Sequence, residues 1–169
     1  MGIETPIFRS AHEALRFAFS FNHAQYQPSP LKRLLCGYSS DRGLFGLEGA
    51  ATAANIKRVI DTLPAVQRSS IICRYTEHKE EFERAAPDLL MVAASALPTG
   101  LHKRIFVMAL IHGYFGRATL RNAVLRDEFG LSHATLGRRR RDVARKLREM
   151  ERVAGDQAEG RLLEARVID

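Results

Sequence analysis

The chain has 169 residues, of which 46% are hydrophobic and 27% charged, and its net charge at neutral pH is +7. This balance is typical of a folded globular protein, and the length suffices for one well-cored domain or two small helical lobes. No apolar run approaches the roughly 20 residues that span a bilayer. The start, "MGIETPIFRS", has no secretory leader and no full myristoylation pattern. We therefore expect a cytoplasmic protein with no membrane partner.

Cysteine and histidine spacing does not predict a metal site. Cys36 and Cys73 lie far apart without a CxxC or CxH neighbour, and the six histidines are scattered along the chain. The acidic cluster around His78, in "YTEHKEEFE", indicates a solvated helix face, because no nucleophile or partner motif accompanies it. We expect cysteines with a packing role, no disulfide, no metal, no cofactor and no catalytic residue.

The first part of the chain contains one clear helical pattern. Residues 8–22 are predicted as a helix, because their apolar side chains recur at helical spacing. Pro28 and Pro30 break the pattern, since proline removes a backbone donor and fixes φ. A short helix is expected over 31–37, followed by a Gly-rich loop over 37–49.

Helical periodicity returns from Gly49 onward, and proline marks the boundaries between the predicted helices. Pro64 suits the first turn of a helix, where its missing N–H costs nothing. The predicted helices are 49–63, 65–79, 79–97 with an interruption near Pro87, and one opened by Leu97-Pro98 that stays apolar through 105–111. Strand signals are almost absent, so we predict an all-α fold, a multi-helix bundle.

Positive charge is concentrated in one stretch of the chain. Between Leu101 and Met150, twelve lysines and arginines are opposed by four acids, an excess larger than the net charge of the whole chain. A basic surface confined to one region is typical of a nucleic-acid-binding protein, and less often of one that binds an anionic membrane. An arginine run on a helix can also be an ordinary solvated face, and this alternative stays open.

The stretch "TLRNAVLRDEFGLSHATLGRRRRDV" predicts a helix, a tight turn and a second helix. The first helix has an apolar face formed by Leu120, Val124 and Leu125. Gly130 follows it, at the position where a chain leaves a helix with positive φ. Ser132 is placed to cap the second helix by accepting a hydrogen bond from the N–H of Thr135.

Successive residues of an α-helix are rotated by about 100° around its axis. This rotation gives the second helix an apolar face and a mainly basic face opposite to it. Its apolar stripe comprises Leu136, Val143, Leu147, Met150 and Ala154. The opposite side comprises Ala134, Arg138, Arg141 and Arg145, with Gly137 and Arg148 at its border. Arg139 and Arg140 flank the stripe, where phosphates or acidic neighbours are better partners than bases.

We expect the start of this second helix to contact double-stranded DNA. The residues expected to face base edges in the major groove are His133, Ala134, Gly137, Arg138 and Arg141, with Thr135 beside them. The residues expected to contact phosphates are Arg117, Arg121, Arg139, Arg145 and Lys146.

This pattern resembles the general helix-turn-helix consensus. The matching residues are Phe129, Gly130, Leu131, Ser132, Thr135 and Leu136, whereas Arg126 departs from it, because most members have a small residue there. The layout over residues 90–150 also resembles region 4 of sigma-70-type factors and the late-gene antiterminators of the Q type from phages. The resemblance implies a phage or prophage transcription regulator that binds DNA near a promoter, with RNA polymerase as a further partner. Zinc-carrying Q proteins are not matched, since their cysteines are missing.

Four segments are predicted from these patterns. They are an N-terminal helical segment with a Gly-rich loop (1–48), central helices (49–95), a basic helix-turn-helix lobe (96–154) and a C-terminal tail or short helix (155–169). Gly155 and Gly160 favour a break before the tail. The alternative to a DNA-binding regulator is a protein-binding adaptor that uses the helix-turn-helix only as a scaffold. Salt-dependent DNA binding discriminates the two.

Overall fold

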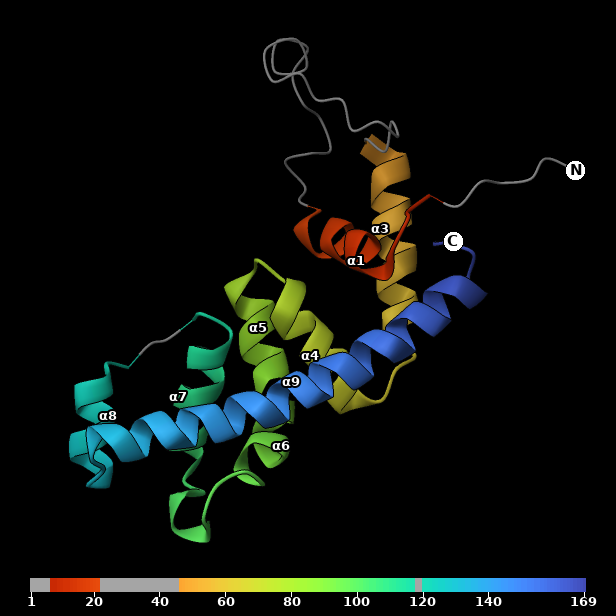
Figure 1. Cartoon of the computed structure of the whole chain (residues 1–169). Coiled ribbons are helices and arrows are strands. Elements are labelled where there is room, and N and C mark those ends of the chain that lie inside the picture. Colours follow the sequence, from red (N-terminus) through yellow and green to blue (C-terminus); the bar gives the residue numbers. More distant parts are fainter. Residues whose placement is uncertain (1–6, 22–45, 118–119) are drawn as a thin grey trace, which may run out of the picture. The chain divides into compact units, whose positions relative to one another are not determined.

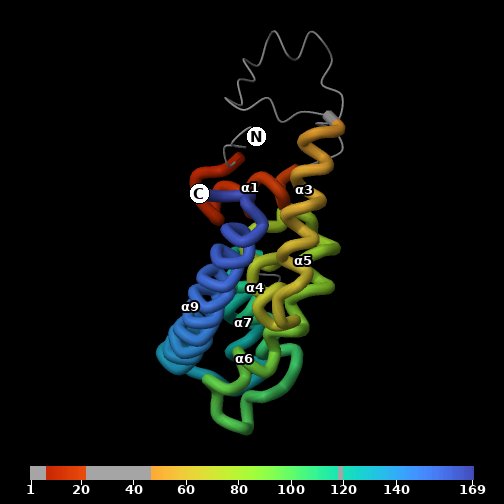
Figure 2. Tube along the Cα trace, turned by 90° about the vertical axis from the view of Figure 1, so that its right-hand side faces the viewer, coloured from red at the N-terminus to blue at the C-terminus, as the bar shows by residue number. Residues whose placement is uncertain are grey.

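The structure, a computed structural model, describes residues 7–21, 46–117 and 120–169 (Figure 1; Figure 2 gives a second view). Within these ranges the chain forms helices and no strand, and one isolated bridge pairs Phe8 with Ile168. The predicted all-α fold class is therefore confirmed. The helix predicted over 31–37 lies outside the described residues, as does Cys36.

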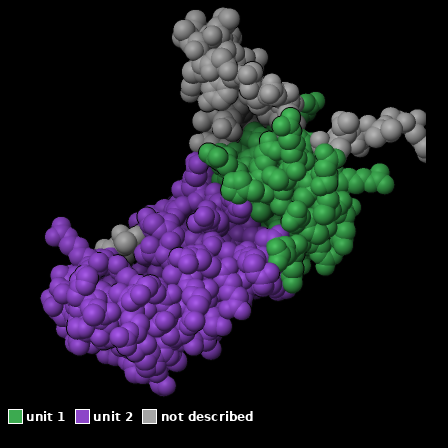
Figure 3. Space-filling model, viewed as in Figure 1, with its two compact units in different colours: residues 1–63, 156–169 green, residues 64–155 purple. Residues whose placement is uncertain are grey.

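The chain divides into two compact units, coloured in Figure 3. Unit 1 comprises residues 1–63 and 156–169, and unit 2 comprises residues 64–155. This division differs from the four predicted segments, because the C-terminal residues join the N-terminal helices in one unit. The predicted boundaries at residues 48 and 95 do not coincide with a boundary between units.

Unit 1 is built from α1 (Ala11–Ser20) and α3 (Gly46–Asp61), which pack together. The hydroxyl of Ser10 accepts a hydrogen bond of 3.3 Å from the N–H of Glu13 and so caps α1. The buried side chains of the two helices include Leu15, Phe19, Ile56 and Ile60. The N–H of Phe8 donates a 3.2 Å hydrogen bond to the carbonyl of Val167, which ties the C-terminal residues to this unit.

Helix α9 (His133–Glu164) is one continuous helix of 32 residues. The predicted break at Gly155 and Gly160 is therefore wrong. Each glycine costs a helix about 1 kcal/mol relative to alanine. However, Ala154, Ala158 and Leu162, which lie before, between and after the two glycines, are fully buried at helical spacing. Burial of this stripe favours the helix over a break.

The end of α9 is closed by a left-handed residue. Arg166 has a φ of 56°, and the N–H groups of Arg166 and Val167 donate to the carbonyls of Leu163 and Leu162 at 2.9 Å each. This is the Schellman arrangement that commonly ends a helix, here with arginine in the position usually taken by glycine. Val167 and Leu162 are both buried, as the apolar contact of that motif requires.

Unit 2 contains short helices around one core. They are α4 (Ala65–Tyr75), α5 (Lys79–Ala85), the 3-10 turn η2 (Ala86–Leu89), α6 (Leu90–Ala94), the 3-10 turn η3 (Thr99–Leu101), α7 (Arg104–Tyr114), α8 (Asn122–Phe129) and the first part of α9. The interruption predicted near Pro87 is confirmed as η2. Pro98 opens only η3, and α7 begins at Arg104, later than predicted. Between them the Nε2 of His102 lies 2.9 Å from the carbonyl of Leu97.

The core of unit 2 joins α7, α8 and α9. Phe106, Leu125 and Leu147 are at most 1% exposed and belong to the same apolar cluster. The predicted stripe on α9 is confirmed, with Met150 half-buried at its edge. Val124 was predicted on the buried face of α8, but its side chain is 46% exposed.

In the described ranges, no helix combines the length and the apolar character that crossing a membrane requires.

Candidate nucleic-acid interface

A three-residue turn joins α8 to α9. Gly130 has φ 60° and ψ 37°, and the N–H of Leu131 donates to the carbonyl of Arg126 at 2.9 Å. The hydroxyl of Ser132 accepts a 3.1 Å hydrogen bond from the N–H of Thr135. Leu131 packs against the core of unit 2. The predicted positive φ and helix cap are thus confirmed, and the turn is fixed by backbone geometry, by a cap and by burial.

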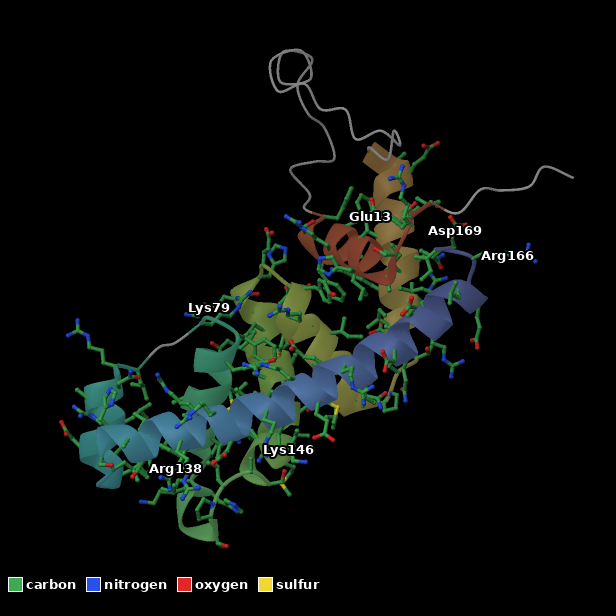
Figure 4. All side chains as sticks on the ribbon, viewed as in Figure 1. Glu13, Lys79, Arg138, Lys146, Arg166 and Asp169 are labelled. Carbon is green, nitrogen blue, oxygen red and sulfur yellow. The ribbon has the colours of Figure 1, made fainter. Side chains whose placement is uncertain are left out.

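The outer side of α9 is basic and exposed over its first half. Ala134, Arg138, Arg141 and Arg145 are all exposed, as predicted, and Arg148 continues the same side. We call these five residues the basic face. From Arg138 to Arg148 it extends about 15 Å at 1.5 Å per residue. Figure 4 labels Arg138 on this part of α9.

The predicted residues at the start of α9 differ in exposure. His133 is exposed, whereas Gly137 and Thr135 are half-buried. The hydroxyl of Thr135 lies 2.9 Å from that of Ser132, so it takes part in the cap. A Cβ at Gly137 would meet no heavy atom within 4 Å. The surface around Gly137 is therefore open to a close-approaching ligand.

One flank of the basic face carries acids, and these are paired. Nη1 of Arg139 lies 3.5 Å from Asp142, and Nζ of Lys146 lies 3.2 Å from Glu149. These ion pairs are partly exposed, and such pairs contribute only about 0–1 kcal/mol. Both cations were predicted to bind phosphates, and a phosphate would have to compete with these carboxylates. In the part of the chain that the structure describes, Arg138 and Arg145 form no ion pair.

Arg117, which was predicted to contact phosphate, makes two contacts within unit 2. Its guanidinium donates a short hydrogen bond to the carbonyl of Thr76 and lies over the ring of Phe82, 4.8 Å from the centroid. It therefore holds the end of α7 against the α4–α5 connection, and a phosphate would have to compete with these contacts. Arg121 precedes the first residue of α8 and is exposed, as phosphate contact would require.

A hollow lies between α7 and α9 on the flank without exposed acids. Its volume is about 230 Å³, and its lining residues are Leu110, Gly113, Tyr114, Arg140, Arg141 and Ala144. The helical spacing placed Arg140 beside the apolar stripe, but it could not show which helix lies opposite. The position of α7 makes Arg140 part of a hollow.

Cys73 and the potential metal ligands are not part of this interface. Cys73 is 2% exposed, in agreement with the predicted packing role, and burial raises the pKa of its thiol to about 12. Among the residues with described positions, no group of three His, Cys, Asp or Glu side chains comes together as a metal site. The basic face presents four exposed arginines and one alanine, and clustered cations attract polyanions.

Comparison with models of known protein families gave no match for this chain, and comparison with curated proteins gave none either. Function is therefore inferred from the geometry of the α8–α9 turn and from the basic face. Both lie within unit 2, whose core fixes α8 and α9 through Leu125, Leu136 and Leu147.

Proposed function

We propose that the chain is a sequence-specific DNA-binding transcription regulator, with the first half of α9 inserted into the major groove. The observation that carries this proposal is the exposed basic face on a helix whose opposite stripe is buried. A major groove about 12 Å wide admits one α-helix. Ala134 and Gly137 allow close approach at the start of α9. The arginines that come after them in the helix would lie near base edges and near the phosphates on either side of the groove.

The arginines divide into two roles in this proposal. Arg138 and Arg141 lie within the first three turns of α9, where side chains of a groove-bound helix reach base edges. A bidentate arginine–guanine contact contributes about 1–3 kcal/mol of discrimination. Arg145 and Arg148 lie further along α9 and contact phosphates, as does Arg121 at the start of α8. Phosphate contacts make the affinity fall steeply with salt.

Fluorescence anisotropy on duplexes tests the proposal. Duplexes selected by the protein from a random library are compared with unselected ones across a salt series. Arg138→Ala should bring the two affinities closer together, whereas Arg145→Ala should weaken binding to both alike. Arg84→Ala, at an exposed arginine of α5, is the matched control and should change neither. No salt-dependent binding, or equal effects from Arg138→Ala and Arg145→Ala, would contradict the groove assignment.

A finer assignment rests on the sequence resemblance to sigma region 4 and the Q-type antiterminators. We propose that the regulator acts with RNA polymerase as an antiterminator, and that it is encoded by a phage or prophage. Transcription through a terminator downstream of the bound site, measured with purified polymerase, tests this role. Readthrough should rise with the wild-type chain and not with Arg138→Ala. Unchanged readthrough at saturating protein would contradict antitermination without affecting DNA binding.

A further inference from the structure

We propose that the hollow between α7 and α9 binds one phosphate group of the DNA backbone. This inference rests on the proposed function and extends it, because it names a contact outside the basic face. The hollow holds about 230 Å³, whereas a water molecule in the liquid takes about 30 Å³. A phosphate group with its water therefore fits.

Two arginines of α9 line this hollow. Arg140 and Arg141 both line it, and α7 lines the opposite side with Leu110, Gly113 and Tyr114. Nη2 of Arg140 lies 3.8 Å from the point that a Cβ on Gly113 would occupy. The missing side chain of Gly113 therefore leaves space directly beside a guanidinium group. Arginine binds phosphate oxygens through its planar donor fork, and these charge-assisted hydrogen bonds are stronger than neutral ones.

Neither arginine is neutralised by an acid within the described residues. Arg140 forms no ion pair there, and Arg141 donates a long hydrogen bond of 3.4 Å from its Nε to the carbonyl of Gly137. One carboxylate, that of Glu151, contacts Tyr114 of the lining. Its Oε2 accepts the hydroxyl of Tyr114 at 2.6 Å, and its Oε1 lies 3.8 Å from Nε of Arg74. Glu151 is thus engaged by Tyr114 and Arg74, and Arg140 and Arg141 bring two positive charges to the wall of the hollow.

The position of the hollow favours a DNA phosphate over a free one. Arg141 belongs both to the basic face and to the wall of the hollow. A helix in the major groove has a DNA backbone on each side. The backbone on the α7 side would therefore pass beside Arg141 and bring a phosphate to Arg140.

The slope of affinity against salt concentration measures this contact. Each neutralised phosphate contributes about 0.9 to the slope of log affinity against log salt. Arg140→Ala should make that slope shallower by about 0.9. Gly113→Leu, which fills the hollow from the α7 side, should do the same, and the double variant should lose no more than either single one. Gly155→Leu is the matched control, because it makes the same change at a helical residue that does not line the hollow.

The outcomes separate this inference from the proposed function. A wild-type chain that binds DNA, with an unchanged slope in Arg140→Ala, would overturn the inference alone. A wild-type chain that does not bind DNA would overturn the proposed function and the inference with it. Thermal unfolding of each variant shows whether it is folded, and Arg140→Ala keeps the test decisive if Gly113→Leu does not fold.

A second arm distinguishes a backbone phosphate from a small phosphate compound. Inorganic phosphate is titrated into the free protein while the arginine Nε–Hε signals are followed by NMR. If the Arg140 signal saturates with phosphate, and Gly113→Leu abolishes the response while the DNA slope stays unchanged, the hollow takes a free phosphate and its assignment to DNA is wrong. A shallower DNA slope in both variants supports the assignment.

Discussion

The hydroxyl of Tyr114 donates a 2.6 Å hydrogen bond to Glu151 and so joins the end of α7 to the middle of α9. The Glu151 side chain is 19% exposed, and it also faces Arg74 of α4. Burial and the hydrogen bond to Glu151 both raise the pKa of Tyr114. The hydroxyl therefore remains protonated and keeps donating at alkaline pH. This contact fixes one wall of the hollow relative to the helix that carries the basic face.

Tyr114→Phe should destabilise the protein by about 1–2 kcal/mol, because it removes a hydrogen bond to a partly buried carboxylate. Urea denaturation measures the loss. A double-mutant cycle with Glu151→Ala isolates the contact, because alanine has no side-chain acceptor, and the cycle should give a coupling energy of similar size. A coupling energy near zero would mean that the hydrogen bond does not hold α7 to α9.

Gly130→Ala should destabilise the turn between α8 and α9 by about 1–2 kcal/mol, the cost of a left-handed φ for a residue with a Cβ. The added methyl would meet no heavy atom within 4 Å, so backbone strain is the whole effect. Gly130→Asn is the control, because asparagine tolerates this conformation better. Equal unfolding free energies for the alanine and asparagine variants would show that φ at this residue is not what limits the turn.

Cys73 should resist alkylation in the native protein at about pH 8, because the thiolate is the reactive form. Burial raises the pKa of its thiol from 9.0 to about 12. The native state therefore loses the thiol proton at a higher pH than the unfolded chain does. The contribution of the protonated thiol to the free energy of unfolding is complete below the unfolded pKa, and it is lost as the pH rises from about 9 to 12.

Iodoacetamide labelling with and without urea, followed by mass spectrometry of the peptide containing Cys73, measures this protection. The native protein should label slowly at this residue and the unfolded protein quickly. Cys73→Ala provides the control for labelling elsewhere in the chain. Rapid native labelling of Cys73 would contradict the burial that the structure assigns to it.

Features that depend on a few neighbouring residues could be predicted from the sequence. The left-handed Gly130 and the Ser132 cap each need only one turn of chain, and the stripe of Leu136, Val143 and Leu147 needs only helical periodicity. The exposure of Arg138 on the opposite side follows from the same periodicity.

Features that depend on contacts between helices far apart in the sequence could not be predicted. Arg117 resembled the other basic residues in sequence, yet its guanidinium is held by Thr76 and Phe82, more than thirty positions earlier. Arg140 lines a hollow because α7 packs beside α9, and the sequence does not show that packing. The continuity of α9 past Gly155 depends on burial of its neighbours, which outweighs the local preference of glycine for a break.

Gly137→Ala should raise stability and lower DNA affinity, two effects that oppose each other. Within a helix, replacing glycine by alanine stabilises by up to about 1 kcal/mol, and the new Cβ meets no atom of the protein within 4 Å. In the proposed complex, however, that methyl group points into the space between α9 and the DNA. An extra methyl group in a close-packed contact costs about 1–3 kcal/mol, which corresponds to a roughly five- to 150-fold weaker affinity.

Gly155→Ala is the matched control for this variant, because it makes the same substitution in the same helix with equally open space around the Cβ. It should give a similar gain in unfolding free energy with no change in DNA affinity. Urea denaturation and anisotropy on a selected duplex measure the two quantities for both variants. If Gly137→Ala binds DNA as tightly as the wild-type chain, Gly137 does not face the groove, and the basic face must approach DNA from the side of Arg145 and Arg148 instead.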